Sequence, residues 1–178
     1  MSVGSDDAFP HTVILKDGSK VLIRRAGPED FKMLFRMFSV LSDDTMFRRF
    51  LRSQKNLTRD DAEEMLRLDD ADVTSLIAIA AKDDVEQAVG EARYVADPTG
   101  KMAEAAAVVS DEWQNRGLGS ALFTDLVAEA KRKGLARMFA YFDVENKSII
   151  HLGQKFGFRL ASKDRETDYS VMKAEITL

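Results

Sequence analysis

The stretch that decides the fold lies at residues 104–122 and reads EAAAVVSDEWQNRGLGSAL. Its first part, Glu104–Val109, is an almost continuous apolar run, which is typical of a central strand buried on both faces. A polar turn follows, and Gly117 and Gly119 then stand at the start of a segment with apolar residues at helical spacing. The sequence therefore predicts a strand, a loop and a helix in direct succession.

The loop between that strand and that helix has the chemistry of an anion site. The first backbone N–H groups of a helix lack a partner within the helix and carry partial positive charge. Gly117 and Gly119 have no Cβ, so a phosphate oxygen can approach the backbone, and Arg116 can add a charge-assisted bond. Two glycines at a helix start are equally often plain turn and packing residues, so both interpretations stay open on this feature alone.

The loop differs from two well-known nucleotide-binding patterns. Leu122 occupies the third glycine position of G-x-G-x-x-G, so the dinucleotide fingerprint is incomplete. No G-K-[ST] follows, so the loop is not that of a nucleoside-triphosphate-binding protein. Gln114–Gly119, which reads QNRGLG, instead fits the pattern [Q/R]-x-x-G-x-[G/A].

Gln114–Gly119 resembles the coenzyme A signature of the GNAT superfamily of N-acetyltransferases. The second signature of that family, an asparagine followed eleven residues later by Gly-Phe, is present as Asn146 and Gly157-Phe158. The segments DGSKVLIRRAGPED (17–30) and LSDDTMFRRF (41–50) look like those of bacterial protein lysine acetyltransferase catalytic domains. In that group the domain is often attached to a regulatory or ligase-like domain.

The rest of the chain predicts a single α/β (α+β) domain with a mixed sheet at residues 11–178, after a flexible tail at residues 1–10. The resemblance implies the GNAT fold, with splayed central strands flanked by helices. Asp17-Gly18 predicts the turn of a hairpin, and helix starts are indicated near Pro28, Asp43 and Thr58. The remaining predicted strands are Val73–Ala81, Ala88–Val95, Arg137–Val144, Phe158–Ala161 and Thr167–Ile176, with a polar turn at Lys82–Gln87; the remaining helices are Gly117–Lys133 and Lys147–Phe156.

The resemblance also implies where acetyl-CoA, the cosubstrate, would bind. In this family the pantetheine arm lies between two splayed strands, which correspond here to Glu104–Val109 and Arg137–Val144. The backbone of Val108 and Val109 would meet the pantetheine and the acetyl carbonyl. The other expected binding residues are Gln114, Asn115, Arg116, Gly117, Leu118, Gly119, Ser120, Asn146 and Ser148. Asn146 has a second interpretation, as the N-cap of the following helix.

Acetyl transfer to an amine needs a base, since a lysine ammonium has a pKa of about 10.4. Our candidate is Glu104, which matches the catalytic glutamate of the protein acetyltransferases; partial burial would raise its pKa. The alternative is a solvated carboxylate at a strand end, and Glu91 on the adjacent strand is the reserve candidate. Gly153 stands where many family members have a tyrosine acting as general acid, which makes a tyrosine-acid mechanism doubtful here.

The composition of the chain limits the classes of partner that it is expected to bind. The 178 residues carry a net charge of −4 and no cysteine, which disfavours nucleic-acid binding and excludes disulfides and thiolate metal sites. No apolar run of about 18 residues is present and no metal-ligand spacing is seen. We expect a cytoplasmic monomer or dimer that binds acyl-CoA and an amine acceptor, either a protein lysine or a small amine. A non-catalytic acyl-CoA-binding module is the third interpretation. Arg48, Arg49 and Arg52 are expected to form a solvated helix face, or else to line an acceptor surface or approach the cosubstrate phosphates.

Overall fold

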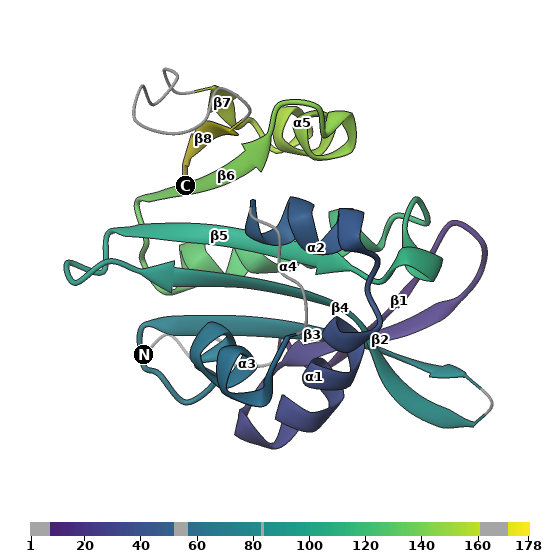
Figure 1. The fold of residues 1–178 in the computed structure, drawn as a ribbon. Helices are drawn as coiled ribbons and strands as arrows, with labels where there is room; N and C mark the ends of the chain where they lie inside the picture. The colour runs from purple at the N-terminus through teal and green to yellow at the C-terminus, as the bar shows by residue number, and fades with distance from the viewer. Residues whose placement is uncertain (1–7, 52–56, 83, 161–170) are drawn as a thin grey trace.

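The computed structural model describes residues 8–51, 57–82, 84–160 and 171–178 (Figure 1). Its strands are β1 (His11–Ile14), β2 (Lys20–Arg25), β3 (Val73–Lys82), β4 (Val85–Ala96), β5 (Met102–Val109), β6 (Arg137–Asp143), β7 (Arg159–Leu160) and β8 (Val171–Thr177). Its helices are α1 (Phe31–Ser39), α2 (Asp43–Phe50), α3 (Arg59–Leu66), α4 (Leu118–Arg132) and α5 (Lys147–Lys155), with short 3-10 turns η1 (Pro28–Asp30) and η2 (Asp111–Trp113). None of these helices is long and apolar enough to cross a membrane.

The described strands form one mixed sheet in the order β1-β2-β3-β4-β5-β6-β8-β7. Neighbouring strands are antiparallel except β5 and β6, which run parallel. A parallel pair needs a long connection, and the loop and α4 supply it between β5 and β6. The predicted mixed sheet is confirmed.

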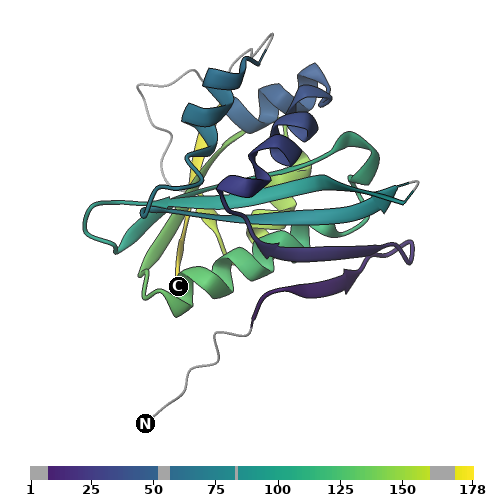
Figure 2. The same cartoon turned by 90° about the horizontal axis from the view of Figure 1, so that it is seen from below.

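Helices cover both faces of this sheet (Figure 2). Helices α1, α2 and α3 lie on one face, where Leu34, Phe38 and Leu66 pack against Ile77 and Ile79 of β3. Helix α4 lies on the other face with its apolar stripe in the larger core cluster, and apolar residues of α5 pack against that cluster. Alternate residues of the central strands therefore enter different cores, which explains their continuous apolar runs.

Two sequence predictions need correction, and two others fall largely outside the described residues. The polar turn is shorter than Lys82–Gln87, because β3 reaches Lys82 and pairs there with Val85; polar side chains at the exposed end of a two-stranded ribbon do not interrupt its ladder. The sequence favours Asp43 and Asp44 as caps of helix α2, but its N-cap is Ser42, whose hydroxyl accepts from the Thr45 N–H. The flexible tail and the start of the last predicted strand lie largely outside the described residues.

Candidate functional site

A cleft opens in the sheet where β5 and β6 separate. The parallel ladder contains the pairs Met102–Arg137, Ala103–Met138 and Glu104–Phe139 and does not continue beyond them. Strand β5 stays paired with β4 as far as Val109, so one edge of β5 is satisfied while the edge that faces β6 is left open. Figure 1 shows the two arrows diverging. The splayed strands expected from the sequence are therefore present, and Glu104 lies at the closed end of the cleft.

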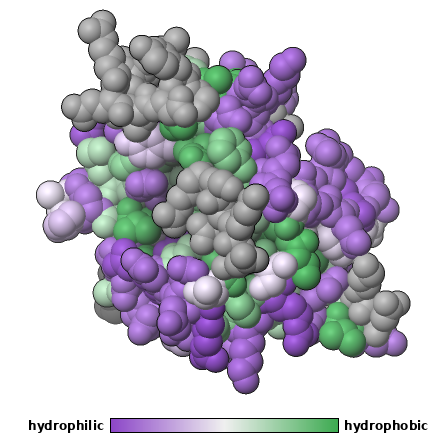
Figure 3. All heavy atoms as spheres, in the orientation of Figure 1, coloured by the Kyte–Doolittle hydropathy of each residue, from purple (hydrophilic) through white to green (hydrophobic). Residues whose placement is uncertain are grey.

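The cleft has a volume of about 220 Å³ and mostly apolar walls. One wall is the 105–109 segment of β5, whose three alanines leave room because their side chains are short, and the facing wall is Ala140, Tyr141 and Phe142 of β6. Apolar surface shows between hydrophilic margins on the face seen in Figure 3. The other lining residues are Thr45, Arg48, Arg49, Gln114, Asn115, Gly119, Phe123, Asn146, Ile149 and Leu152. The shape and chemistry suit an extended, weakly polar chain.

The glycine loop closes the other end of the cleft. Asn115 and Gly117 both have positive φ, 61° and 97°, so the chain turns sharply before α4. Gly117 is the N-cap of α4, and no side chain caps its first N–H groups. Since Asn115 and Gly119 line the cleft, the uncapped N-terminus of a 15-residue helix lies at its rim. This geometry suits a pyrophosphate.

The side chains of Gln114 and Arg116 are engaged within the protein. Gln114 Nε2 donates to the Val109 carbonyl and to the Thr45 hydroxyl, each over 3.0 Å. Arg116 binds Asp17 over 2.8 Å, donates to the Glu112 carbonyl and stacks on Trp113. A phosphate would have to compete with Asp17 for this guanidinium. The side chain of Gln114 therefore holds the loop in place.

The other expected binding positions differ in what they can offer. Val108 and Leu118 are buried; Val108 is paired with Glu91 of β4, and Leu118 is the first residue of α4. Val109 and Asn146 line the cleft directly. Ser120 is half-buried on the first turn of α4, whereas the side chain of Ser148 lies outside the described part of the structure.

Glu104 is exposed, so the expectation that it is partly buried was wrong. The reason is a gradient along one face of β5: Val108 is covered by α1–α3, Ala106 is half-buried, and Glu104 lies near the strand start beyond this cover. Exposure leaves the carboxylate accessible to an incoming amine.

Glu91, the reserve candidate, is fully buried on the same face. Its carboxylate accepts from the Ser75 hydroxyl over 2.9 Å and lies 3.8 Å from Arg49 Nη2 and 3.9 Å from Arg93 Nε. A fully buried carboxylate enclosed by two guanidinium groups is inaccessible to an amine. The geometry thus favours Glu104 over Glu91 as a base.

The arginines of α2 do not share one environment. Arg48 is 43% exposed and bonds Asp44, as expected for a solvated helix face. Arg49 has a side chain only 10% exposed, so that expectation was wrong for Arg49: its guanidinium turns toward the sheet and the cleft. Arg49 lies three residues after the buried Met46 and four after Thr45, a spacing that places it on the inner helix face. Arg52 lies outside the described residues.

Helix α5 has a polar residue at its N-cap, Asn146, and no tyrosine among its residues Lys147–Lys155. Asn146 Oδ1 accepts from the Ile149 N–H over 3.3 Å, so Asn146 is the N-cap of α5 while it also lines the cleft. A Cβ at Gly153 would meet Phe158 at 3.5 Å, on the core side of the helix. Tyr141 of β6 does line the cleft. The sequence did not predict this, because the residue pattern of one strand does not show where that strand separates from its neighbour in the sheet.

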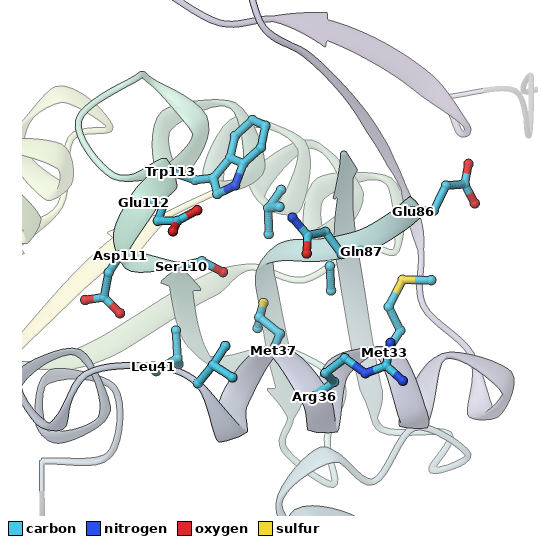
Figure 4. A pocket seen from close by; sticks show the side chains of 13 residues that line it. Met33, Arg36, Met37, Leu41, Glu86, Gln87, Ser110, Asp111, Glu112 and Trp113 are labelled. Atoms are coloured by element: carbon cyan, nitrogen blue, oxygen red, sulfur yellow. The ribbon is translucent and has the colours of Figure 1, made fainter. Parts of the chain in front are cut away.

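A second cavity, of about 260 Å³, lies on the far side of the α2 N-terminus (Figure 4). Met33, Met37 and Leu41 extend into it opposite Ser110–Trp113, and Glu86 stands at its margin. Asp111 lines this second cavity and is hydrogen-bonded to a residue that lines the cleft. Its carboxylate accepts from the Thr45 hydroxyl over 2.6 Å, and also from Ser42. Burial alone would raise the pKa of Asp111, but these hydrogen bonds lower it, so the carboxylate is charged at neutral pH. Neither cavity holds a cluster of three metal-ligating side chains among the described residues.

The loop and both signature segments fall within a match to a family model. The model of the acetyltransferase (GNAT) family matches residues 37–158, more than half of the chain. The chain belongs to this family. It is therefore a member of the GNAT acetyltransferase family, and the splayed strands and the glycine loop before α4 are features that the sequence predicted.

Individual relatives extend the likeness over nearly the whole chain. The chain is 27% identical over 149 residues to acetyltransferase Pat of Mycolicibacterium smegmatis, a match that covers 83% of this chain and 44% of that protein. The GNAT domain of S. lividans PAT superposes with a TM-score of 0.80 at 24% identity and covers 95% of this chain and 97% of that one. A cAMP-binding acyltransferase from Mycobacterium smegmatis has a TM-score of 0.63 at 24% identity over 95% of this chain and 47% of that one. The chain thus spans less than half the length of the curated relative.

Proposed function

We propose that this GNAT acetyltransferase moves an acetyl group from acetyl-CoA to a lysine side chain of a protein, with Glu104 as general base. The observation that carries the proposal is the position of Glu104 at the point where β5 and β6 separate. A pyrophosphate at the glycine loop and an arm along β5 would direct the thioester toward this closed end. The similarity to Pat supports a protein acceptor.

The reaction follows from these positions. The Glu104 carboxylate takes a proton from the lysine ammonium, and the freed nitrogen lone pair attacks the thioester carbonyl carbon. The N–C bond forms, the C–S bond breaks, and the sulfur leaves with the bonding electron pair as a thiolate. The nitrogen then loses its second proton, which passes through solvent to the thiolate. A backbone N–H of the 105–109 segment that faces the cleft would bind the carbonyl oxygen, and one such donor lowers the barrier by about 3 kcal/mol.

The test is a thiol-release assay with acetyl-CoA against a panel of small amines and lysine-bearing proteins, including acyl-CoA synthetases. We expect turnover with a protein and little with free amines. Preference for a small amine would support the alternative acceptor class. Tight acetyl-CoA binding without thiol release on any acceptor would support a non-catalytic acyl-CoA-binding module instead.

The base is tested by Glu104→Gln, with Glu64→Gln on the exposed face of α3 as control. We expect Glu104→Gln to lower kcat about 100-fold at neutral pH, with the deficit shrinking at higher pH because more of the lysine is already a free amine. Unchanged turnover in Glu104→Gln at neutral pH would show that the base is another group.

A further inference from the structure

Arg49 is a buried cation that the family signatures do not account for. Its side chain extends from α2 onto the sheet, lines the cleft beside the 105–109 segment, and is 10% exposed. Arginine stays protonated in proteins, so a full positive charge sits at the wall of the acyl-CoA site. Ala106, with its short side chain, stands between the Glu91 and Glu104 positions on this face of the sheet and leaves room for the guanidinium.

The charges around Arg49 leave it incompletely paired. Glu91 is the carboxylate closest to it, at 3.8 Å, and it is shared with Arg93. Glu104 acts on Arg49 as well, but it is exposed. Burial lowers the pKa of Arg49, and the positive charge of Arg93 lowers it further. The negative charges of Glu91 and Glu104 act in the opposite direction and raise this pKa. Two buried guanidinium groups therefore face one buried carboxylate, and the balance at the cleft wall is positive.

A purely structural bridge between α2 and β4 does not explain this geometry. The 3.8 Å separation from Glu91 is longer than a hydrogen bond. Arg49 Nε is buried and has no hydrogen-bond partner among the described residues. A buried donor left without a partner costs about 1–3 kcal/mol, so natural proteins retain few of them without a functional reason. Arg93, by contrast, donates to the Met65 carbonyl over 2.6 Å.

The position of Arg49 along β5 identifies the group that it would meet. Arg49 lines the cleft together with the 105–109 segment of β5, along which the pantetheine arm and the thioester would lie, and its charge interacts with that of Glu104, the proposed base at the closed end. The part of the cosubstrate within reach is thus the thioester and not the pyrophosphate, which belongs at the glycine loop. The matching acceptor for an N–H donor there is the thioester oxygen, on which negative charge develops during attack.

Resting on the acetyl-transfer function proposed above, we propose that Arg49 donates to the thioester oxygen and stabilises the charge that develops on it. The backbone donors of β5 bind this oxygen from the sheet, and Arg49 adds a charged donor from α2. Helix α2 thereby becomes part of the catalytic machinery as well as a wall of the cleft.

The first test needs no acceptor and measures the carbonyl itself. Difference infrared spectroscopy of bound acetyl-CoA, labelled with ¹³C at the acetyl carbonyl, reports polarisation as a shift of the band to lower frequency. We expect this shift in the unmodified protein, most of it lost in Arg49→Gln and part of it restored in Arg49→Lys. Arg59→Gln on the exposed surface of α3 is the control and should keep the full shift. An unchanged band in Arg49→Gln would overturn the proposal.

Kinetics and binding separate this role from a structural one. We expect Arg49→Gln to lower kcat about 100-fold at saturating acetyl-CoA while the Kd of CoA, which has no carbonyl, changes less than about 3-fold. If Arg49 only anchored α2, Arg49→Gln would lower the melting temperature and CoA affinity with kcat preserved, and Glu91→Gln would do the same. Absence of turnover on every acceptor would refute the proposed function, whereas the infrared result would still decide on Arg49.

Discussion

The side-chain amide of Gln114 donates to the hydroxyl of Thr45 over 3.0 Å, so the first residue of the loop signature is attached to helix α2. The same amide donates to the Val109 carbonyl, and Thr45 in turn donates to Asp111. The end of β5, the loop and the start of α2 are therefore one hydrogen-bonded unit. The position of the phosphate-binding backbone depends on a helix about 70 residues earlier in the chain.

Removing either partner should loosen this unit. We expect Thr45→Val and Gln114→Ala each to weaken CoA binding about 5- to 10-fold, since each loses hydrogen bonds worth about 1 kcal/mol apiece. Because both act through the same contact, the double variant should be less impaired than the two effects combined predict. Calorimetric titration with CoA measures this, with the exposed Gln154→Ala as control. Full additivity would show that the two residues act independently.

The two loop glycines should respond differently to alanine. Gly117 has a φ of 97°, so Gly117→Ala introduces strain of about 1–2 kcal/mol and should weaken CoA binding. Gly119 lies in the first turn of α4, and a Cβ there would meet only Val109, at 3.8 Å. Gly119→Ala should therefore keep CoA affinity and raise stability by about 0.5–1 kcal/mol. Thermal melts and CoA titrations of the pair test this, and equal damage from both would contradict it.

Asn146 has two roles that substitutions can separate. Asn146→Ser keeps a capping oxygen for α5, whereas Asn146→Ala removes it and should lower stability by about 1 kcal/mol. If Asn146 also binds the pantetheine arm, both variants should bind acetyl-CoA more weakly, although only the alanine variant melts earlier. Normal affinity in Asn146→Ser would leave capping as its sole role.

The Asp30–Arg24 pair should give the fold a measurable acid sensitivity. Arg24 donates to both Asp30 oxygens over 2.6 and 2.7 Å, and the Gly27 N–H donates over 3.0 Å. Burial alone would raise the pKa of Asp30, but these hydrogen bonds lower it. The contribution to stability is thus present above the unfolded pKa of about 3.9 and is lost as the pH falls through the lower folded value.

Asp30→Asn should therefore destabilise the protein by about 2 kcal/mol near neutral pH. The gap to the unmodified protein should close as the pH falls below about 4, because protonation then weakens the native pair as well. Urea unfolding at several pH values measures this. A gap that stays constant down to pH 3 would mean that the Asp30 charge does not matter.

The sequence predicted what local patterns determine. The strand, loop and helix around Gln114–Gly119, the β1–β2 hairpin and the order of elements follow from periodicity and turn residues. The exposure of Glu104 could not be predicted, because it depends on how far α1–α3 extend over β5. The burial of Arg49 was not predicted, because a charged side chain is usually solvated. Its spacing of three residues from Met46 nevertheless indicated the inner face of α2.

The separation of β5 from β6 has a thermodynamic consequence for the whole protein. Among the described residues, the β5–β6 ladder that joins the β1–β5 portion of the sheet to the β6–β8 portion contains three residue pairs. With the proposed function, an acyl-CoA arm bound between the strands would act as a substitute strand and help to hold the two portions together. At a concentration 100 times its Kd, it would add about 2.7 kcal/mol to the folding free energy. The folding free energy of the protein would thereby be linked to the supply of its own cosubstrate.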